Sequence, residues 1–199
     1  MSGLSFHSPT ALQRYIFRSM QHPWLLQADA TLTRQQRRAR NVIPPRDLPA
    51  STVLYRSDGA ARGQGGMDGS VQASYAAVRW EGGVITGRRS ALVGDSTNNV
   101  AEYSGILSAL NDAVARVPRL ACFQTDSLLI ARQISGRWRC RSRDLQPLYE
   151  EALELLCRLR RLGSVCEVLH IYREFNAEAD SSANRALDSG HGENVSWLG

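Results

Sequence analysis

Four carboxylates lie where predicted strands end or predicted helices begin, and they are the side chains best suited to chemistry: Asp58, Glu102, Asp126 and Asp180. Strand ends and helix starts of a layered α/β domain can meet in one cleft. We expect no basic residue among them, so divalent cations would have to neutralise their charge. Oxygen ligands of this kind select Mg²⁺ or Mn²⁺. Two such ions about 4 Å apart can hydrolyse a phosphodiester without a protein nucleophile, so the pattern predicts a two-metal site.

Each acid also has a purely structural explanation. Asp58 begins an Asp-Gly pair, which is typical of a turn. Asn99 and Glu102 have the spacing of a capping box at a helix start. Asp126 could cap the helix that follows it. Asp180 could be a solvated acid that the dipole of its helix stabilises near the helix start. A catalytic role is therefore indicated only because all four acids occur together at strand ends and helix starts of one predicted domain.

Apolar periodicity predicts the elements that must position these acids. Strands are predicted over 51–56, 73–80, 83–92, 120–125 and 164–173. Helices are predicted over 100–115, 127–134, 144–163 and 176–188. The order predicts an α/β domain with a mixed five-stranded sheet, in which three antiparallel strands are followed by two parallel ones, covered by helices.

The basic charge is concentrated in the first quarter of the chain. Residues 1–50 contain seven arginines and two aspartates, which matches the net charge of +5 of all 199 residues. This basic N-terminal extension precedes a balanced domain over 51–189 and a C-terminal tail over 190–199. Its composition resembles a mitochondrial transit peptide, and it also suits an anionic partner. We expect either a targeting segment or an arm ordered by RNA or protein subunits; a floppy basic tail is the third interpretation.

Membrane insertion is not expected. No stretch approaches the roughly 20 consecutive apolar residues that a spanning helix requires.

Four sequence motifs occur in a fixed order: SDGAARG, TNNVAEY, QTDSLL and REFNAEAD. They resemble the motif set of type-1 ribonucleases H and of the related reverse-transcriptase-associated domains, over about residues 51–188. The resemblance implies a ribonuclease H-like fold and cleavage of the RNA strand of RNA/DNA hybrids. By this likeness the four acids are both catalytic residues and ligands of two Mg²⁺ ions, with Mn²⁺ as the alternative metal.

Six further residues are predicted to bind the substrate: Gly59, Asn98, Asn99, Arg137, Trp138 and Arg139. The glycine belongs to the first motif. The two asparagines match family positions that contact sugar and backbone in the minor groove of the hybrid. The last three interleave basic and aromatic side chains, as expected for phosphate contact and base stacking. A solvated loop is an equally good interpretation of these three.

The chain departs from the family in one loop. Many members carry a histidine shortly before the last aspartate, where this chain has the segment 172–176, Tyr-Arg-Glu-Phe-Asn. His170 falls within a predicted strand and is interpreted as a core residue. The departure implies a lower rate rather than a loss of activity.

These observations lead to two hypotheses from different classes. The first is a metal-dependent endoribonuclease acting on RNA/DNA hybrids. The second is a ribonuclease H-like structural subunit of a large ribonucleoprotein, held through its basic arm. A mitochondrial location is expected from the transit-like opening, with cytoplasm or nucleus as alternatives. A junction-resolving or exonuclease relative fits the second and third motifs less well.

Overall fold

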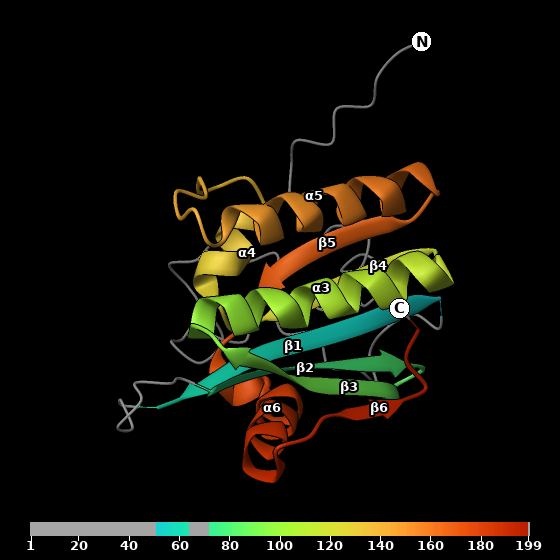
Figure 1. Cartoon of the computed structure of the whole chain (residues 1–199). Coiled ribbons are helices and arrows are strands. Elements are labelled where there is room, and N and C mark those ends of the chain that lie inside the picture. The colour runs from blue at the N-terminus through green and yellow to red at the C-terminus, as the bar shows by residue number, and fades with distance from the viewer. Residues whose placement is uncertain (1–50, 64–71, 199) are drawn as a thin grey trace, which may run out of the picture.

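A mixed six-stranded sheet organises the residues that the computed structural model describes, 51–63 and 72–198 (Figure 1). The strands are β1 (Thr52–Arg62), β2 (Gln72–Glu81), β3 (Val84–Asp95), β4 (Leu120–Thr125), β5 (Val165–His170) and β6 (Glu193–Val195). The helices are α3 (Asn98–Arg116), α4 (Leu128–Ile134), α5 (Gln146–Arg161) and α6 (Ala177–Ser189), with a 3₁₀ turn η4 (Arg173–Phe175). The predicted basic extension over 1–50 lies outside the described residues.

The sheet topology confirms the predicted mixed architecture. Strands β1, β2 and β3 form an antiparallel meander, while β4 pairs parallel to β1 and β5 pairs parallel to β4. The spatial order is β5-β4-β1-β2-β3-β6. The predicted number of strands was one too low, because β6 pairs antiparallel with β3 inside the segment that we assigned to a tail. A strand of three residues is too short to show a periodicity in the sequence.

Strand β1 is longer than predicted, and its extra length matters for the acids. It was expected to end at Asp58, but its pairing with β2 continues to Arg62. The parallel pairing of β1 with β4 stops at Ser57, opposite Thr125, which is one residue before Asp58. Asp58 therefore lies on a continuous strand, just beyond the end of its neighbour, where one edge of β1 is left open.

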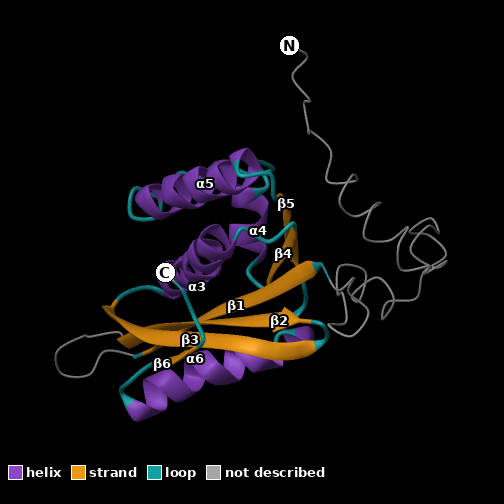
Figure 2. Cartoon of the chain, turned by 90° about the vertical axis from the view of Figure 1, so that its right-hand side faces the viewer, coloured by secondary structure: helices purple, strands orange, loops and turns teal. Residues whose placement is uncertain are grey.

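Helices cover both faces of the sheet (Figure 2). Helices α3, α4 and α5 lie on one face, and α6 lies on the other against β1, β2 and β3. Because side chains alternate along a strand, Tyr55 points into the larger core and Leu54 into the smaller one. Tyr55 stacks on Phe123 with ring centroids 5.1 Å apart. None of the described helices is both long enough and apolar enough to cross a membrane.

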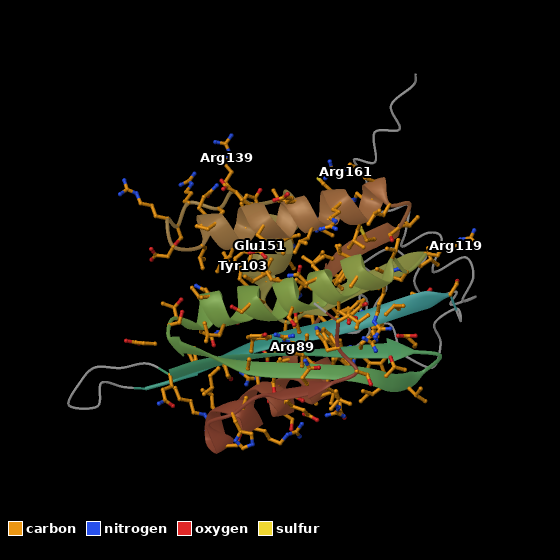
Figure 3. The ribbon with its side chains drawn as sticks, turned by 45° about the vertical axis from the view of Figure 1, so that its right-hand side comes forward. Arg89, Tyr103, Arg119, Arg139, Glu151 and Arg161 are labelled. Atoms are coloured by element: carbon orange, nitrogen blue, oxygen red, sulfur yellow. The ribbon has the colours of Figure 1, made fainter. Side chains whose placement is uncertain are left out.

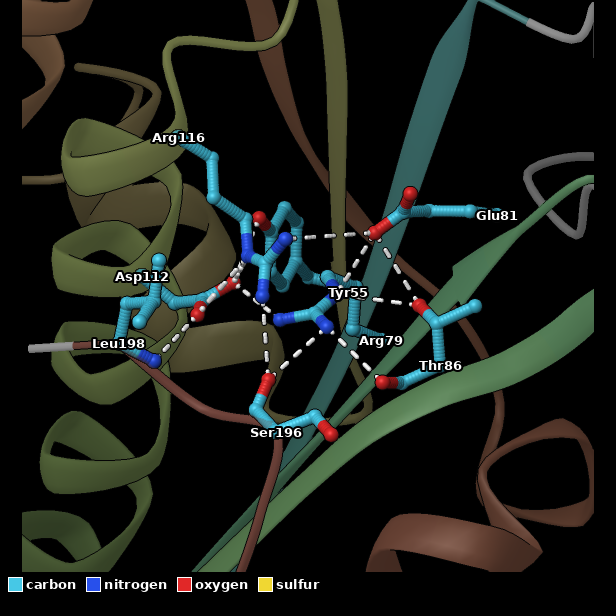
Figure 4. A network of polar contacts seen from close by, with 8 residues as sticks. All are labelled: Tyr55, Arg79, Glu81, Thr86, Asp112, Arg116, Ser196 and Leu198. Carbon is cyan, nitrogen blue, oxygen red and sulfur yellow. Dashed lines mark hydrogen bonds and ion pairs between the residues drawn. The ribbon is translucent and has the colours of Figure 1, made fainter.

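A buried polar network fastens the C-terminal segment to the sheet and to α3 (Figure 4). Arg79 is only 2% exposed, and its Nη1 donates to Asp112 Oδ2 at 2.8 Å. Its Nη2 donates to the carbonyl of Ser196, while the backbone N–H of Leu198 donates to Asp112 Oδ1. Trp197, which lies between Ser196 and Leu198 in the chain, is buried against the larger core. The network thus incorporates residues beyond 189 into the folded domain.

Removing the carboxylate of this network tests its contribution. The Asp112→Ala variant is expected to lower the free energy of unfolding by about 3–5 kcal/mol, because it removes the buried partner of Arg79 and leaves only the more exposed Glu81 to pair with that buried charge. Urea denaturation measures the effect. The control is Asp188→Ala, which breaks the exposed ion pair with Arg62 and should cost about 1 kcal/mol or less. Equal losses in the two variants would contradict the assignment.

A second buried charge lies on β5. Both carboxylate oxygens of Glu167 are buried without a hydrogen-bond partner among the described residues. Burial raises the pKa of Glu167 to about 7, although the positive charge of Arg137 opposes the shift. The folded state therefore holds this proton more tightly than the unfolded chain. The resulting stabilisation is complete below the unfolded pKa and is lost as the pH rises through about 7.

The Glu167→Gln variant is expected to be more stable than the wild type at pH 8, by roughly 1–3 kcal/mol. Near pH 4.5 the gain should vanish, because the wild-type carboxyl is then neutral in the folded state. Thermal or urea unfolding across this pH range measures the difference. The exposed Glu154→Gln on α5 is the matched control and should show no such pH-dependent gain.

Candidate functional site

Asp58 is the centre of the predicted acidic site. It is 5% exposed, and the backbone N–H of Gly59 donates to its Oδ1 at 2.8 Å. Burial raises the pKa of Asp58 to about 8, and the negative charge of Asp126 adds to the effect. The Gly59 hydrogen bond opposes the shift, whereas Asp180 and Glu102 increase it further. The structure thus brings all four predicted acids into electrostatic contact from four separate segments.

Two glycines allow β1 and α3 to approach closely enough for this. A Cβ added to Gly59 would lie 2.2 Å from the backbone nitrogen of Glu102. A Cβ on Gly105 would lie 2.9 Å from the carbonyl oxygen of Asp58. Only glycine fits at these positions, and Glu102 is consequently held beside Asp58. The structure gives Gly59 a packing role, and its predicted substrate contact stays a prediction.

Glu102 is not part of the expected capping box. Helix α3 is capped by Thr97, whose Oγ1 accepts from the N–H of Val100 at 3.4 Å. Instead of capping, Asn98 donates its Nδ2 to Glu102 Oε1 at 2.8 Å, and Asn99 is exposed in the first turn. Burial raises the pKa of Glu102, whereas side-chain hydrogen bonds from Ser127 and Asn98 oppose the shift. Its Oε2 is buried with no hydrogen-bond partner in the described part of the chain.

Asp126 is likewise not the cap of the following helix. Ser127 caps α4, since its side chain accepts from the N–H of Ile130. Asp126 Oδ1 accepts from Asn176 Nδ2 at 2.8 Å, and the same amide donates to the carbonyl of Ser57 at 3.0 Å. Asn176 is fully buried, so it fixes Asp126 to β1. We had assigned Asn176 only a helix start, and its sole sequence signal was its place in the fourth motif.

Asp180 lies in the first turn of α6, where it forms an ion pair with Arg173 of η4. The expectation that no basic side chain lies among the acids was therefore wrong. The predicted strand over 164–173 would have carried Arg173 away from α6. In the structure β5 ends at His170, and the 3₁₀ turn brings the guanidinium to Asp180.

The basic loop after α4 is exposed, and no described contact joins it to the four acids. The N–H groups of Arg137 and Trp138 both donate to the carbonyl of Arg132, which fixes the loop to the helix. Gln133 Nε2 donates to the carbonyl of Arg139. The Arg139 side chain points away from the domain (Figure 3). Substrate contact by residues 137–139 remains a prediction.

The acids have the chemistry of a hard-cation site, although the described residues do not form a ready-made cage. Among them, no group of three or more His, Cys, Asp or Glu side chains is placed so that it could hold a metal ion. Two observations nevertheless fit a cation: Asp58 is buried against like charges, and Glu102 Oε2 has no partner among the described residues. Mg²⁺ commonly completes its coordination with water and substrate phosphate, so a partly formed protein cage suits it.

The glycine contact between β1 and α3 can be tested directly. Gly59→Ala is expected to lower the free energy of unfolding by about 3 kcal/mol or more, because its Cβ meets backbone rather than a flexible side chain. The control is Gly82→Ala, at φ +58° with no atom within 4 Å of the added Cβ. It should cost only the backbone strain of about 1–2 kcal/mol. A smaller loss in Gly59→Ala than in the control would contradict the packing role.

The sequence of this chain matches one family model and several known proteins. The family model described as "Reverse transcriptase-like" matches residues 61–186. The chain is 35% identical over 139 residues to a bifunctional protein of Mycobacterium tuberculosis, covering 69% of this chain and 36% of the relative. It therefore spans about a third of that relative's length. It is 31% identical over 131 residues to ribonuclease HI of Halobacterium salinarum, covering 66% and 62% of the two chains.

Solved structures show the same likeness. The N-terminal ribonuclease H domain of the M. tuberculosis protein is similar with a TM-score of 0.61 and 34% identity, covering 69% of this chain and 94% of that domain. Ribonuclease H1 of H. salinarum gives a TM-score of 0.60 and 32% identity, with 69% and 98% covered. LC11-RNase H1, solved in complex with an RNA/DNA hybrid, gives 0.60 and 29% identity, also with 69% and 98% covered.

Proposed function

This chain belongs to the ribonuclease H-type, reverse transcriptase-like family, and from that premise we propose that it is a metal-dependent endonuclease hydrolysing the RNA strand of RNA/DNA hybrids. The observation that carries the proposal is the convergence of four acids, from four segments, around the buried Asp58. Its relative LC11-RNase H1 binds an RNA/DNA hybrid in the solved complex, which supports the substrate class.

The structural explanations of three acids are removed by the fold. Asp58 lies on a continuous strand rather than in a turn. Glu102 is not in a capping box, and Asp126 does not cap α4. These three carboxylates serve as neither turn residue nor helix cap, and their negative charges repel one another. Such a cluster is a feature of functional sites, where the repulsion is tolerated because the chemistry requires it.

Four acids would hold the cations in this proposal: Asp58, Glu102, Asp126 and Asp180. Bound Mg²⁺ would supply an activated water on one side of the scissile phosphate and charge stabilisation for the leaving 3′ oxygen. The protein's own task is to orient the ligands. Asn176 fixes Asp126, Asn98 orients Glu102, and the Gly59 N–H holds Asp58.

Recognition of the RNA strand is assigned to the start of α3. Asn99 is exposed one turn before Glu102 and is free of any described side-chain hydrogen bond, so its amide is available to a 2′-hydroxyl or sugar oxygen. Asn98 is exposed as well and can exchange its bond to Glu102 for a substrate contact. The exposed loop over 137–139 would add phosphate contacts and stacking.

The alternative of a structural subunit in a ribonucleoprotein has no support from the relatives described above. The physical chemistry also argues against it. Burying Asp58 against three other carboxylates costs stability, as its raised pKa shows, and a purely structural subunit gains nothing in return. The basic extension, on which that alternative depended, lies outside the described residues.

A cleavage assay tests the proposal. Wild-type protein with Mg²⁺ is expected to cut a labelled RNA/DNA hybrid and to leave duplex DNA intact. Asp126→Asn should lower the rate by about 100-fold or more, because it removes a metal-ligating charge. The variant can still accept the Asn176 hydrogen bond, so it should remain folded.

The matched control is Asp188→Asn, an exposed acid two turns further along α6, which should cleave like the wild type. Equal turnover by Asp126→Asn and wild type, or no cleavage by the wild type, would refute the proposed function.

A further inference from the structure

Arg173 combines a hydrogen-bonded backbone with a largely exposed side chain beside the four acids. Its turn is closed by the hydrogen bonds Phe175 N–H to Tyr172 O and Asn176 N–H to Arg173 O, each 2.9 Å. The adjoining Asn176 is buried and bonded to Asp126. The Arg173 side chain, by contrast, is 74% exposed. The guanidinium can therefore move while its attachment point stays beside the acids.

Its partner Asp180 is more exposed than the central acid of the site: Asp180 is 28% exposed, whereas Asp58 is 5% exposed. The charge of Arg173 acts mainly on Asp180 and more weakly on Asp58 and Asp126. It also acts on Glu102. Arg173 thus influences all four acids but forms an ion pair with Asp180.

We infer that Arg173 is an exchangeable counter-charge: it pairs with Asp180 while no divalent cation is bound there, releases it when a cation binds, and then contacts a phosphate of the nucleic acid. This inference rests on the proposed function and adds to it a residue that couples metal binding to substrate binding. No covalent step is involved, since one ion pair is exchanged for two others.

The exchange is physically reasonable because the existing pair is weak. The arginine of this pair is 74% exposed, and solvent screening weakens ion pairs at such positions, so a doubly charged ion can displace the guanidinium. An arginine and a cation compete for the Asp180 carboxylate, because bringing the two positive charges together is unfavourable. The released guanidinium has a planar fork of donors that matches phosphate oxygens. A lysine at this position would keep the charge but lose the fork.

Two other ion pairs on α6 show what an ordinary surface pair looks like. Arg62 pairs with Asp188, and Arg88 pairs with Glu178. The partner of each is an acid outside the group of four. Arg62 is the better control, because it too is more than half exposed and pairs with an aspartate of the same helix.

The first test is calorimetric titration of the full chain with Mg²⁺ alone, repeated with Mn²⁺. Arg173→Ala is expected to bind the cation about two- to fivefold more tightly than wild type, because its competitor for Asp180 is gone. Arg62→Ala removes an arginine of β1 that pairs with a different aspartate of α6, Asp188, and should leave the affinity unchanged. Thermal unfolding of both variants checks that they are folded. Unchanged or weaker metal binding in Arg173→Ala would overturn the exchange.

The second test measures hybrid binding against salt concentration, in the cleavage-deficient Asp126→Asn background with Mg²⁺. Adding Arg173→Ala should weaken binding and reduce the salt slope by about one. Arg173→Lys should keep the slope, while Arg62→Ala should behave like the parent. Identical slopes with and without the Arg173 guanidinium would overturn the phosphate contact.

The two proposals fail differently. If the wild type cleaves no hybrid but Arg173→Ala still binds Mg²⁺ more tightly, the proposed function is refuted and the exchange stands. If the wild type cleaves and Arg173→Ala binds Mg²⁺ like the wild type, the function stands and the exchange is refuted.

Discussion

Mutual repulsion among carboxylates around a buried aspartate is the constraint on which the rest of this structure depends. Asp58 lies out of water and feels three other acids, and both effects raise its pKa. The repulsion is tolerated because each acid accepts a hydrogen bond from its own donor. These donors are the Gly59 N–H, the amides of Asn98 and Asn176, and the Arg173 guanidinium. Three of these donors are neutral, and Arg173 supplies a positive charge to Asp180 alone by direct contact.

The fold separates this uncompensated charge from a compensated one. Helix α3 carries Glu102 near its start and Asp112 ten residues later, about 15 Å along the axis. Asp112 is buried but paired with Arg79 and Arg116, and it binds the C-terminal segment as well. One end of the helix therefore contributes to stability through satisfied charges. The other end leaves Glu102 Oε2 without a partner among the described residues, and that end belongs to the proposed site.

The relatives define the extent of this domain. The described residues correspond to almost the whole of the solved mycobacterial ribonuclease H domain, yet to about a third of the full mycobacterial protein. The likeness therefore concerns the ribonuclease H domain and not the further parts of the longer mycobacterial protein. Within the domain, the segment before Asp180 carries Arg173, which is ion-paired to that aspartate.

Local pattern was sufficient to predict most elements, the four motifs and the four acids, because strand and helix periodicity are encoded by neighbouring residues. Nothing local could show that β1 continues past Asp58, since its extension depends on pairing with β2. Several polar residues near each helix start are suited to cap it, so the local sequence does not identify the cap. In the structure Thr97, and not Asn99, caps α3.

The contacts that organise the site were beyond the reach of the sequence for the same reason. Asn176 bonds to the carbonyl of Ser57, 119 residues away, and to Asp126, 50 residues away. Arg173 reaches Asp180 only because a 3₁₀ turn replaces the end of the predicted strand. The sequence by itself identified the four acids as candidate metal ligands. Only the tertiary structure decided which donors hold them, because those donors come from segments that meet through the packing of the sheet and its helices.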